Sequence, residues 1–138
     1  MEVYADTLYW IAVARPEDSW ADVARQARAA VKDARLVTTH EVLSEFLTAL
    51  SGGGPELRTT AAQMVRAILA SPDVRVVPQS HESFLAGLAQ YENRADKSYS
   101  MVDCISMQAM RAAGISSVLT NDRHFCQEGF VVLISRRK

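Results

Sequence analysis

The sequence lacks the features that define secreted, membrane and zinc-ribbon proteins. Its 138 residues include only two cysteines, Cys104 and Cys126, too few for a disulfide framework or a four-cysteine zinc ribbon, which indicates a reducing, intracellular setting. No apolar run approaches the roughly 18 residues that a membrane-spanning helix needs. The N-terminus carries Glu2 and Asp6 and has neither the basic nor the apolar region of a signal peptide. We therefore expect a cytoplasmic protein with no membrane partner.

An excess of basic residues is also absent. The chain has 16 acidic and 15 basic residues and a net charge of −1, whereas proteins that bind phosphate backbones are typically basic. The total would mislead if acids gathered around metal ions: setting four of the 16 acids aside leaves 12 against 15 bases, a charge of +3. The net charge therefore disfavours a nucleic-acid partner without excluding one.

Short apolar runs alternate with helical patterns along the chain, and SGGGPE at 51–56 is the one strong breaker. This alternation is typical of βαβ units with a parallel sheet covered on both faces. The length fits a single domain, 1–138. We predict an α/β fold, a single α/β/α sandwich with a mainly parallel sheet of about five strands. The predicted strands are 3–5, 36–38, 74–77, 118–119 and 130–134, and the helices include one after 16–18 that runs to about Ala34, capped by Asp18 or Ser19, and helices at 40–50 and 100–113.

Two acidic residues follow predicted strands. Asp6 comes directly after the first strand, and Asp122 comes two residues after Thr120, at the end of the fourth. An acid in such a place is ordinarily a helix cap or a turn residue. In an open parallel sheet, however, ligands bind at the carboxyl ends of the strands, where the strand order reverses. If the first and fourth strands are neighbours, Asp6 and Asp122 lie on the same edge.

The predicted helix 40–50 carries two glutamates. Periodicity places Glu45 on the border of its apolar side and Glu41 about 40° further toward solvent. A border glutamate is ordinarily a surface residue whose stem covers apolar neighbours. If one of the two faces a site, we expect it to be Glu45.

The predicted helix 100–113 is apolar nearly all round and should be largely buried. Asp103 lies in its first turn and forms a capping-box pattern with Ser100. A buried carboxylate must be paired, protonated or metal-bound, because burying it alone is very costly. Capping and metal binding are therefore compatible roles for Asp103, while Cys104 is expected to be a small buried residue.

Four acids, Asp6, Glu45, Asp103 and Asp122, would form a cluster that repels itself unless a cation neutralises it. Hard oxygen ligands suit one or two Mg²⁺ or Mn²⁺ ions rather than zinc. We expect Asp6, Asp103 and Asp122 to bind metal, with Glu45 completing the site or orienting a water. Such ions assist the hydrolysis of phosphodiester bonds, which is the chemistry that this cluster predicts.

Four segments, found in order over essentially the whole length, carry a family resemblance: YADTLYWIA (4–12), TTHEVLSEFLTAL (38–50), YSMVDCISMQAMRAAGISSVLTNDRHF (99–125) and GFVVLI (129–134). Together they resemble the PIN-domain nucleases, most closely the compact toxin ribonucleases called VapC. The most specific stretch is S-x-x-D-C followed by LTNDRHF.

The resemblance implies a PIN-like fold and a metal-dependent endoribonuclease, the toxin of a toxin–antitoxin pair, acting on structured RNA such as transfer RNA. It also implies a homodimer and a cognate antitoxin that covers the acidic groove. The matching positions are Asp6, Glu45, Asp103 and Asp122 for the family's acids, and Ser100, Thr120 and Asn121 for polar residues that neighbour them.

The chain departs from the family pattern at two positions, both of which bear on substrate contacts. Leu8 replaces a small residue, and the segment near Trp20 lacks a histidine that the family often has. Arg123 is expected either to contact phosphate or to be an ordinary surface arginine. We expect His124 to pack or cap beside Phe125 rather than to join the site.

Other enzymes with a similar sheet fit less well. A phosphorelay receiver needs an acid at the end of the third strand, where this chain has Val77 and Pro78, and a phosphatase that forms an aspartyl-phosphate needs a second acid at the position of Leu8. The alternative that stays open is a non-catalytic PIN-fold module that binds RNA or protein.

Overall fold

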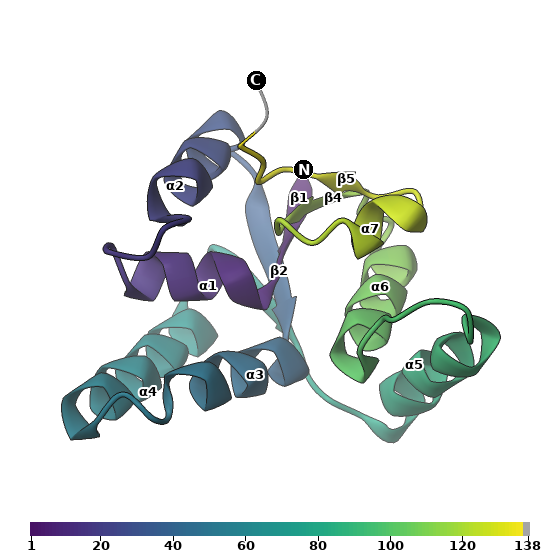
Figure 1. Cartoon of the computed structure of the whole chain (residues 1–138), viewed down its shortest axis with the longest axis horizontal. Helices are drawn as coiled ribbons and strands as arrows, with labels where there is room; N and C mark the ends of the chain where they lie inside the picture. The colour runs from purple at the N-terminus through teal and green to yellow at the C-terminus, as the bar shows by residue number, and fades with distance from the viewer. Residues whose placement is uncertain (137–138) are drawn as a thin grey trace.

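The computed structural model describes residues 1–136, so the predicted domain runs two residues beyond the described part. Five strands form one sheet, with helices on both sides of it (Figure 1). The strands are β1 (Glu2–Ala5), β2 (Arg35–Thr39), β3 (Val74–Val77), β4 (Ser117–Leu119) and β5 (Val131–Val132), and the helices of the described chain are α1 (Thr7–Ala14), α2 (Ala21–Ala30), α3 (His40–Leu50), α4 (Pro55–Ala70), α5 (His81–Asn93), α6 (Met101–Ala113) and α7 (His124–Gln127).

The strand order is β3-β2-β1-β4-β5, and every neighbouring pair is parallel. Helices α1 to α4 lie on the left of the sheet in Figure 1, and α5 and α6 lie on the right. The chain adds strands outward from β1 to β3, then returns to place β4 against the free side of β1. This arrangement confirms the predicted α/β sandwich and makes the first and fourth strands neighbours.

The core forms where the central strands meet the apolar sides of α3 and α6. Val3, Tyr4 and Val118 are fully buried, as continuous apolar strands of a covered parallel sheet should be. The Tyr4 hydroxyl donates to Ser106 Oγ at 2.7 Å, so the polar end of this core side chain is satisfied. Helix α6 is less buried than predicted, because only five of its 13 residues are buried, but Cys104 is fully buried as expected.

Helices α5 and α6 pack closely, which fixes the position of α6 against the sheet. A Cβ at Gly87 of α5 would lie 2.5 Å from Ile105 Cγ1 of α6, so only glycine allows this approach. Helix α6 begins with Ser100 as its N-cap and ends at Gly114 in the left-handed region at φ 69°, both as predicted.

Some predicted boundaries are wrong. Helix α2 ends at Ala30 rather than near Ala34, because the Arg28 guanidinium donates to the carbonyls of Val31 and Ala34 and stabilises a turn there. Neither Asp18 nor Ser19 caps α2: Trp20 is the N-cap, and Asp18 Oδ1 accepts its N–H at 2.8 Å instead.

The end of the described chain also differs from the prediction. Strand β5 is shorter than the predicted 130–134, and the four-residue helix α7 was not predicted. Among residues 1–136, no helix combines the length and apolar character that crossing a membrane requires.

Candidate active site

The register of β1 against β4 brings the two strand-end acids to one edge of the sheet. Ala5 pairs with Leu119, so Asp6 and Thr120 leave the sheet side by side. Asp6 N–H donates to the Leu119 carbonyl at 3.2 Å, and the Thr120 hydroxyl donates to Asp6 Oδ2 at 2.9 Å. Thr120 also accepts the N–H of Asp122 at 3.2 Å, which leaves its own proton free for Asp6.

Asp6 is a carboxyl group held almost out of water, at 8% exposure. Its pKa is raised to about 7, chiefly by burial and to a smaller extent by the nearby charges of Asp103 and Glu45, while hydrogen bonds from the Thr7 backbone and the Thr120 hydroxyl oppose the rise. A cation bound beside this carboxyl group would stabilise its ionised form.

Glu45 of α3 lies near the same edge. Its Oε1 accepts a hydrogen bond from the Thr7 hydroxyl, and its charge contributes to the raised pKa values of Asp6 and Asp103. The prediction that Glu45 rather than Glu41 faces the acids agrees with these contacts. The predicted exposures are wrong, however: Glu45 is exposed, and Glu41 is half-buried in a different hollow.

Asp103 is held by the first turn of α6. Its Oδ2 accepts the Ser100 N–H at 3.0 Å, and the Ser100 hydroxyl accepts the Asp103 N–H at 3.0 Å, so the predicted capping box is confirmed. Burial raises the Asp103 pKa, Asp122 and Glu45 add to the rise, and the bonds from Ser100 oppose it. Asp103 therefore caps its helix and faces the other acids at once.

Asp122 turns the chain after β4. Its Oδ1 accepts the N–H of His124 at 2.9 Å, which is the turn chemistry expected of an aspartate. The same carboxylate contributes to the raised pKa of Asp103. Asp122 therefore stabilises its turn and lies near Asp103 at once, just as Asp103 caps its helix and faces the other acids.

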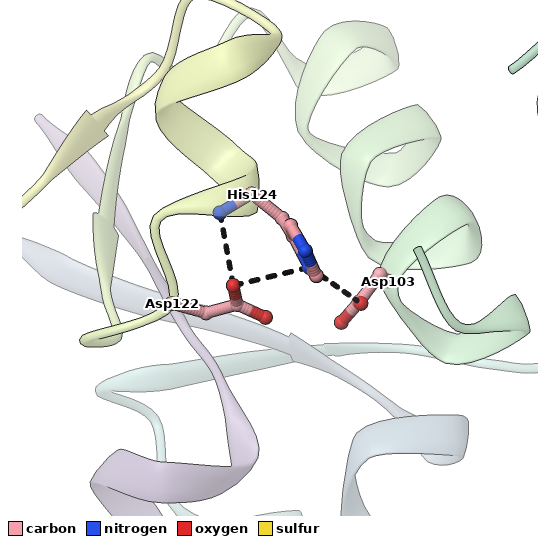
Figure 2. Close-up of side chains that lie close together, drawn as sticks. All are labelled: Asp103, Asp122 and His124. Carbon is pink, nitrogen blue, oxygen red and sulfur yellow. Dashed lines mark hydrogen bonds and ion pairs between the residues drawn. The ribbon is translucent and has the colours of Figure 1, made fainter. Parts of the chain in front are cut away.

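His124 lies between two of the acids, contrary to the expectation that it would only pack or cap. Its Nδ1 is 3.2 Å from Asp122 Oδ1 and 3.8 Å from Asp103 Oδ2 (Figure 2). Ligand atoms of these three residues all lie within 4.8 Å of one another, and carboxylate and imidazole groups are donors for divalent ions. The signal that could have found His124 is its spacing, two residues after an acid in a turn.

The remaining predicted residues divide between the acids and a neighbouring hollow. Ser100 and Thr120 each bond an acid, as described above. Asn121 and Arg123 instead line a hollow of about 430 Å³ beside Trp20 and Arg136, whose guanidinium stacks 3.8 Å from the Trp20 ring centroid. A further hollow of about 450 Å³, between the end of β3 and helices α5 and α6, includes none of the four acids.

The sequence model of the PIN-domain family matches residues 3–130 of this chain. The chain belongs to the PIN-domain family. This PIN domain is 27% identical over 129 residues to proteins from two strains of Mycobacterium tuberculosis, each named 23S rRNA-specific endonuclease VapC20, covering 94% of this chain and 95% of theirs. It also superposes on the crystal structure of Mycobacterium tuberculosis VapC20, described as a sarcin-ricin loop cleaving toxin, with a TM-score of 0.84 and 28% identity, covering 96% of this chain and 99% of that one.

These comparisons confirm the predicted family and PIN-like fold. They also support the predicted enzyme class, because the matched homologues of this PIN domain are VapC-type endonucleases. Within the described residues, Asp103, Asp122 and His124 form a group of side chains that could hold a metal ion.

Proposed function

We propose that this protein is a metal-dependent endoribonuclease that hydrolyses phosphodiester bonds in RNA. The observation that carries the proposal is the convergence of Asp6, Glu45, Asp103 and Asp122 from four separate elements on one sheet edge. Like charges gathered around a buried carboxyl group, that of Asp6, are costly without a counter-ion, and this supports a site suited to a cation.

We assign the binding of one or two Mg²⁺ or Mn²⁺ ions to Asp6, Asp103 and Asp122. When bound, such an ion supplies positive charge that stabilises phosphate oxygens and makes water more acidic. Thr120 orients the Asp6 carboxylate, and the Ser100 N–H orients that of Asp103. To Glu45, which is exposed and accepts a hydrogen bond from Thr7, we assign the acceptance of a proton from the attacking water.

For the substrate we propose a structured loop of large-subunit ribosomal RNA, because the homologues that match over almost the whole chain carry that specificity in their names. Transfer RNA, the target class expected from the sequence, is the competing substrate. A cytoplasmic toxin of this kind would act as a homodimer and be held inactive by a cognate antitoxin over the acidic edge.

The test is to incubate the purified protein, freed of bound partners, with ribosomes, total RNA or transfer RNA, with and without Mn²⁺. Asp103→Asn removes a charge from the site but keeps an oxygen that can accept the Ser100 N–H, and Asp33→Asn removes an exposed charge elsewhere. We expect discrete 23S rRNA fragments from the wild type and Asp33→Asn with Mn²⁺, and at least 100-fold less cleavage from Asp103→Asn.

Cleavage of transfer RNA alone would overturn the ribosomal target and leave the nuclease. Absence of cleavage by folded, Mn²⁺-loaded protein on every RNA would overturn the enzyme and favour the non-catalytic binding module.

A further inference from the structure

His124 has one ring nitrogen whose surroundings the fold alone does not explain. Nδ1 is buried and, within the described part of the chain, makes no hydrogen bond, although it lies 3.2 Å from Asp122 Oδ1 and 3.8 Å from Asp103 Oδ2. A buried polar atom without a partner is unusual and costs free energy. Here the atom faces two carboxylates rather than solvent (Figure 2).

The rest of the ring is held in place from the other side. Nε2 lies 3.2 Å from Ser98 Oγ, and the ring packs on Tyr99 with centroids 5.2 Å apart. A histidine that binds metal through one nitrogen ordinarily donates its other N–H to an oxygen, which fixes the tautomer and aims the free lone pair. Ser98 is placed to accept that hydrogen, and Nδ1 is then the free lone pair.

The spacing of the donor atoms fits an ion between them. Two ligands at right angles around an ion, each about 2.1 Å from it, are separated by about 3.0 Å. The observed separations from Nδ1 to the two carboxylates, 3.2 and 3.8 Å, need only small adjustments to meet this value.

We propose that Nδ1 of His124 is a direct ligand of a divalent ion that Asp103 and Asp122 also bind, making this end of the site a mixed nitrogen–oxygen centre that prefers Mn²⁺ to Mg²⁺. This rests on the proposed function, which assigns metal to the carboxylates alone. An imidazole ligand favours transition metals, whereas Mg²⁺ favours oxygen ligands. His124 thereby sets which ion the enzyme selects.

The rival interpretation is that His124 is a fixed positive charge that pairs with the two acids and competes with the ion. The two readings predict opposite results for a variant without the ring nitrogens. Loss of a ligand weakens Mn²⁺ binding, whereas loss of a competing charge strengthens it.

The experiment measures Mn²⁺ and Mg²⁺ binding to the full chain by calorimetry, and detects nitrogen bound to Mn²⁺ by pulsed electron paramagnetic resonance. His124→Phe keeps a ring against Tyr99 and removes both nitrogens. The matched control is His81→Phe, which makes the same change at an exposed histidine at the start of α5.

We expect ¹⁴N modulation from Mn²⁺ in the wild type and in His81→Phe and none in His124→Phe. Mn²⁺ affinity should fall at least tenfold in His124→Phe and Mg²⁺ affinity much less, so the preference between the ions shrinks. Ser98→Ala, which keeps the ring and removes the partner of Nε2, should weaken Mn²⁺ binding by a smaller factor and serves if His124→Phe does not fold.

Mn²⁺ that binds the wild type without ¹⁴N modulation, or binds His124→Phe more tightly, would overturn this inference and leave the proposed function standing. A wild-type protein that does not bind Mn²⁺ at millimolar concentration would instead overturn the metal site of the proposed function, and this inference with it.

Discussion

Asp6 shows how much of the site depends on the surroundings of a single side chain. Its carboxyl group lies where β1 ends, nine-tenths out of water and within reach of two other acids. The same residue type in a surface turn would be fully charged at neutral pH. Burial, rather than the residue type, raises the pKa of Asp6, and a cation bound nearby would lower that pKa again.

In the metal-free protein, Asp6 should make stability depend on pH. Its pKa is 3.8 in the ordinary state and about 7 when folded, so between these values the folded protein holds a proton that the unfolded chain releases. The free energy of unfolding therefore falls as pH rises from about 4 to 7, by up to about 4 kcal/mol from this group. Asp6→Asn cannot ionise and should lack this loss.

Urea unfolding in EDTA at several pH values measures the effect. The stability of Asp6→Asn relative to the wild type should increase steadily across this range. If the free energies of unfolding of the two proteins instead change in parallel with pH, Asp6 is not held in its neutral form.

Thr120 should matter to metal binding because its hydroxyl supports both Asp6 and the turn that carries Asp122. Thr120→Val keeps the shape of the buried side chain but removes the hydroxyl that donates to Asp6 and accepts from Asp122. We expect Mn²⁺ affinity to fall roughly tenfold, the lower end of effects seen when a ligand loses its supporting hydrogen bond. Calorimetry checks this against Thr120→Ser, which retains the hydroxyl and should bind nearly as the wild type does.

At the scale of elements, helices α5 and α6 have the same N-terminal capping motif, but only the cap of α6 includes a residue of the acidic cluster. Helices α5 and α6 both begin with a capping box, formed by Ser80 with Ser83 and by Ser100 with Asp103. Only the second box holds one of the clustered acids. The pair therefore separates the contribution of a cap to stability from its contribution to the site.

Ser80→Ala and Ser100→Ala should each lower the free energy of unfolding by about 1 kcal/mol, the usual effect of losing an N-cap. Only Ser100→Ala should also weaken Mn²⁺ binding, by several-fold, because Asp103 then loses one of its two bonds to the cap. Chemical denaturation and calorimetry on both variants test this. Equal metal affinities in the two variants would mean that the cap does not position Asp103.

At the scale of the molecule, Glu128 joins segments that flank the site. This nearly buried carboxylate accepts hydrogen bonds from Arg94 after α5, Tyr99 before α6 and Arg111 within α6, at distances of 2.8 to 3.1 Å. The bonds from Arg94 lower the pKa of Glu128 most. The network ties the segment after α7 to the segment that begins α6.

Glu128→Gln should lower the free energy of unfolding by about 2–3 kcal/mol at pH 7, below the range for a fully buried pair because both arginines are partly exposed. Since the folded pKa of Glu128 lies below its ordinary 4.5, the wild type loses this stabilisation as pH falls through that lower value. The difference in free energy of unfolding between the wild type and Glu128→Gln should therefore become smaller under acid conditions. If urea unfolding shows that this difference stays constant as pH falls, the charge of Glu128 is not its cause.

Much of the fold could be read from local patterns. The alternation of apolar runs and helices, the cap at Ser100 and the stop at Gly114 depend on residues within a few positions of one another, so short-range chemistry determines them. The strand-end positions of Asp6 and Asp122 are local in the same sense. The sequence alone thus determined the class of fold and which acids stand at the ends of strands.

Only the tertiary structure decided which of these side chains meet. Thr120 bonds Asp6 across 114 positions of sequence, and that contact exists because β4 pairs with β1. The half-buried place of Glu41 and the orientation of His124 depend on neighbouring helices and on a short turn after β4, neither of which leaves a periodic signal. Periodicity describes one element at a time, whereas a site at a sheet edge is made by the packing of several, and this is why His124 emerged only from the folded chain.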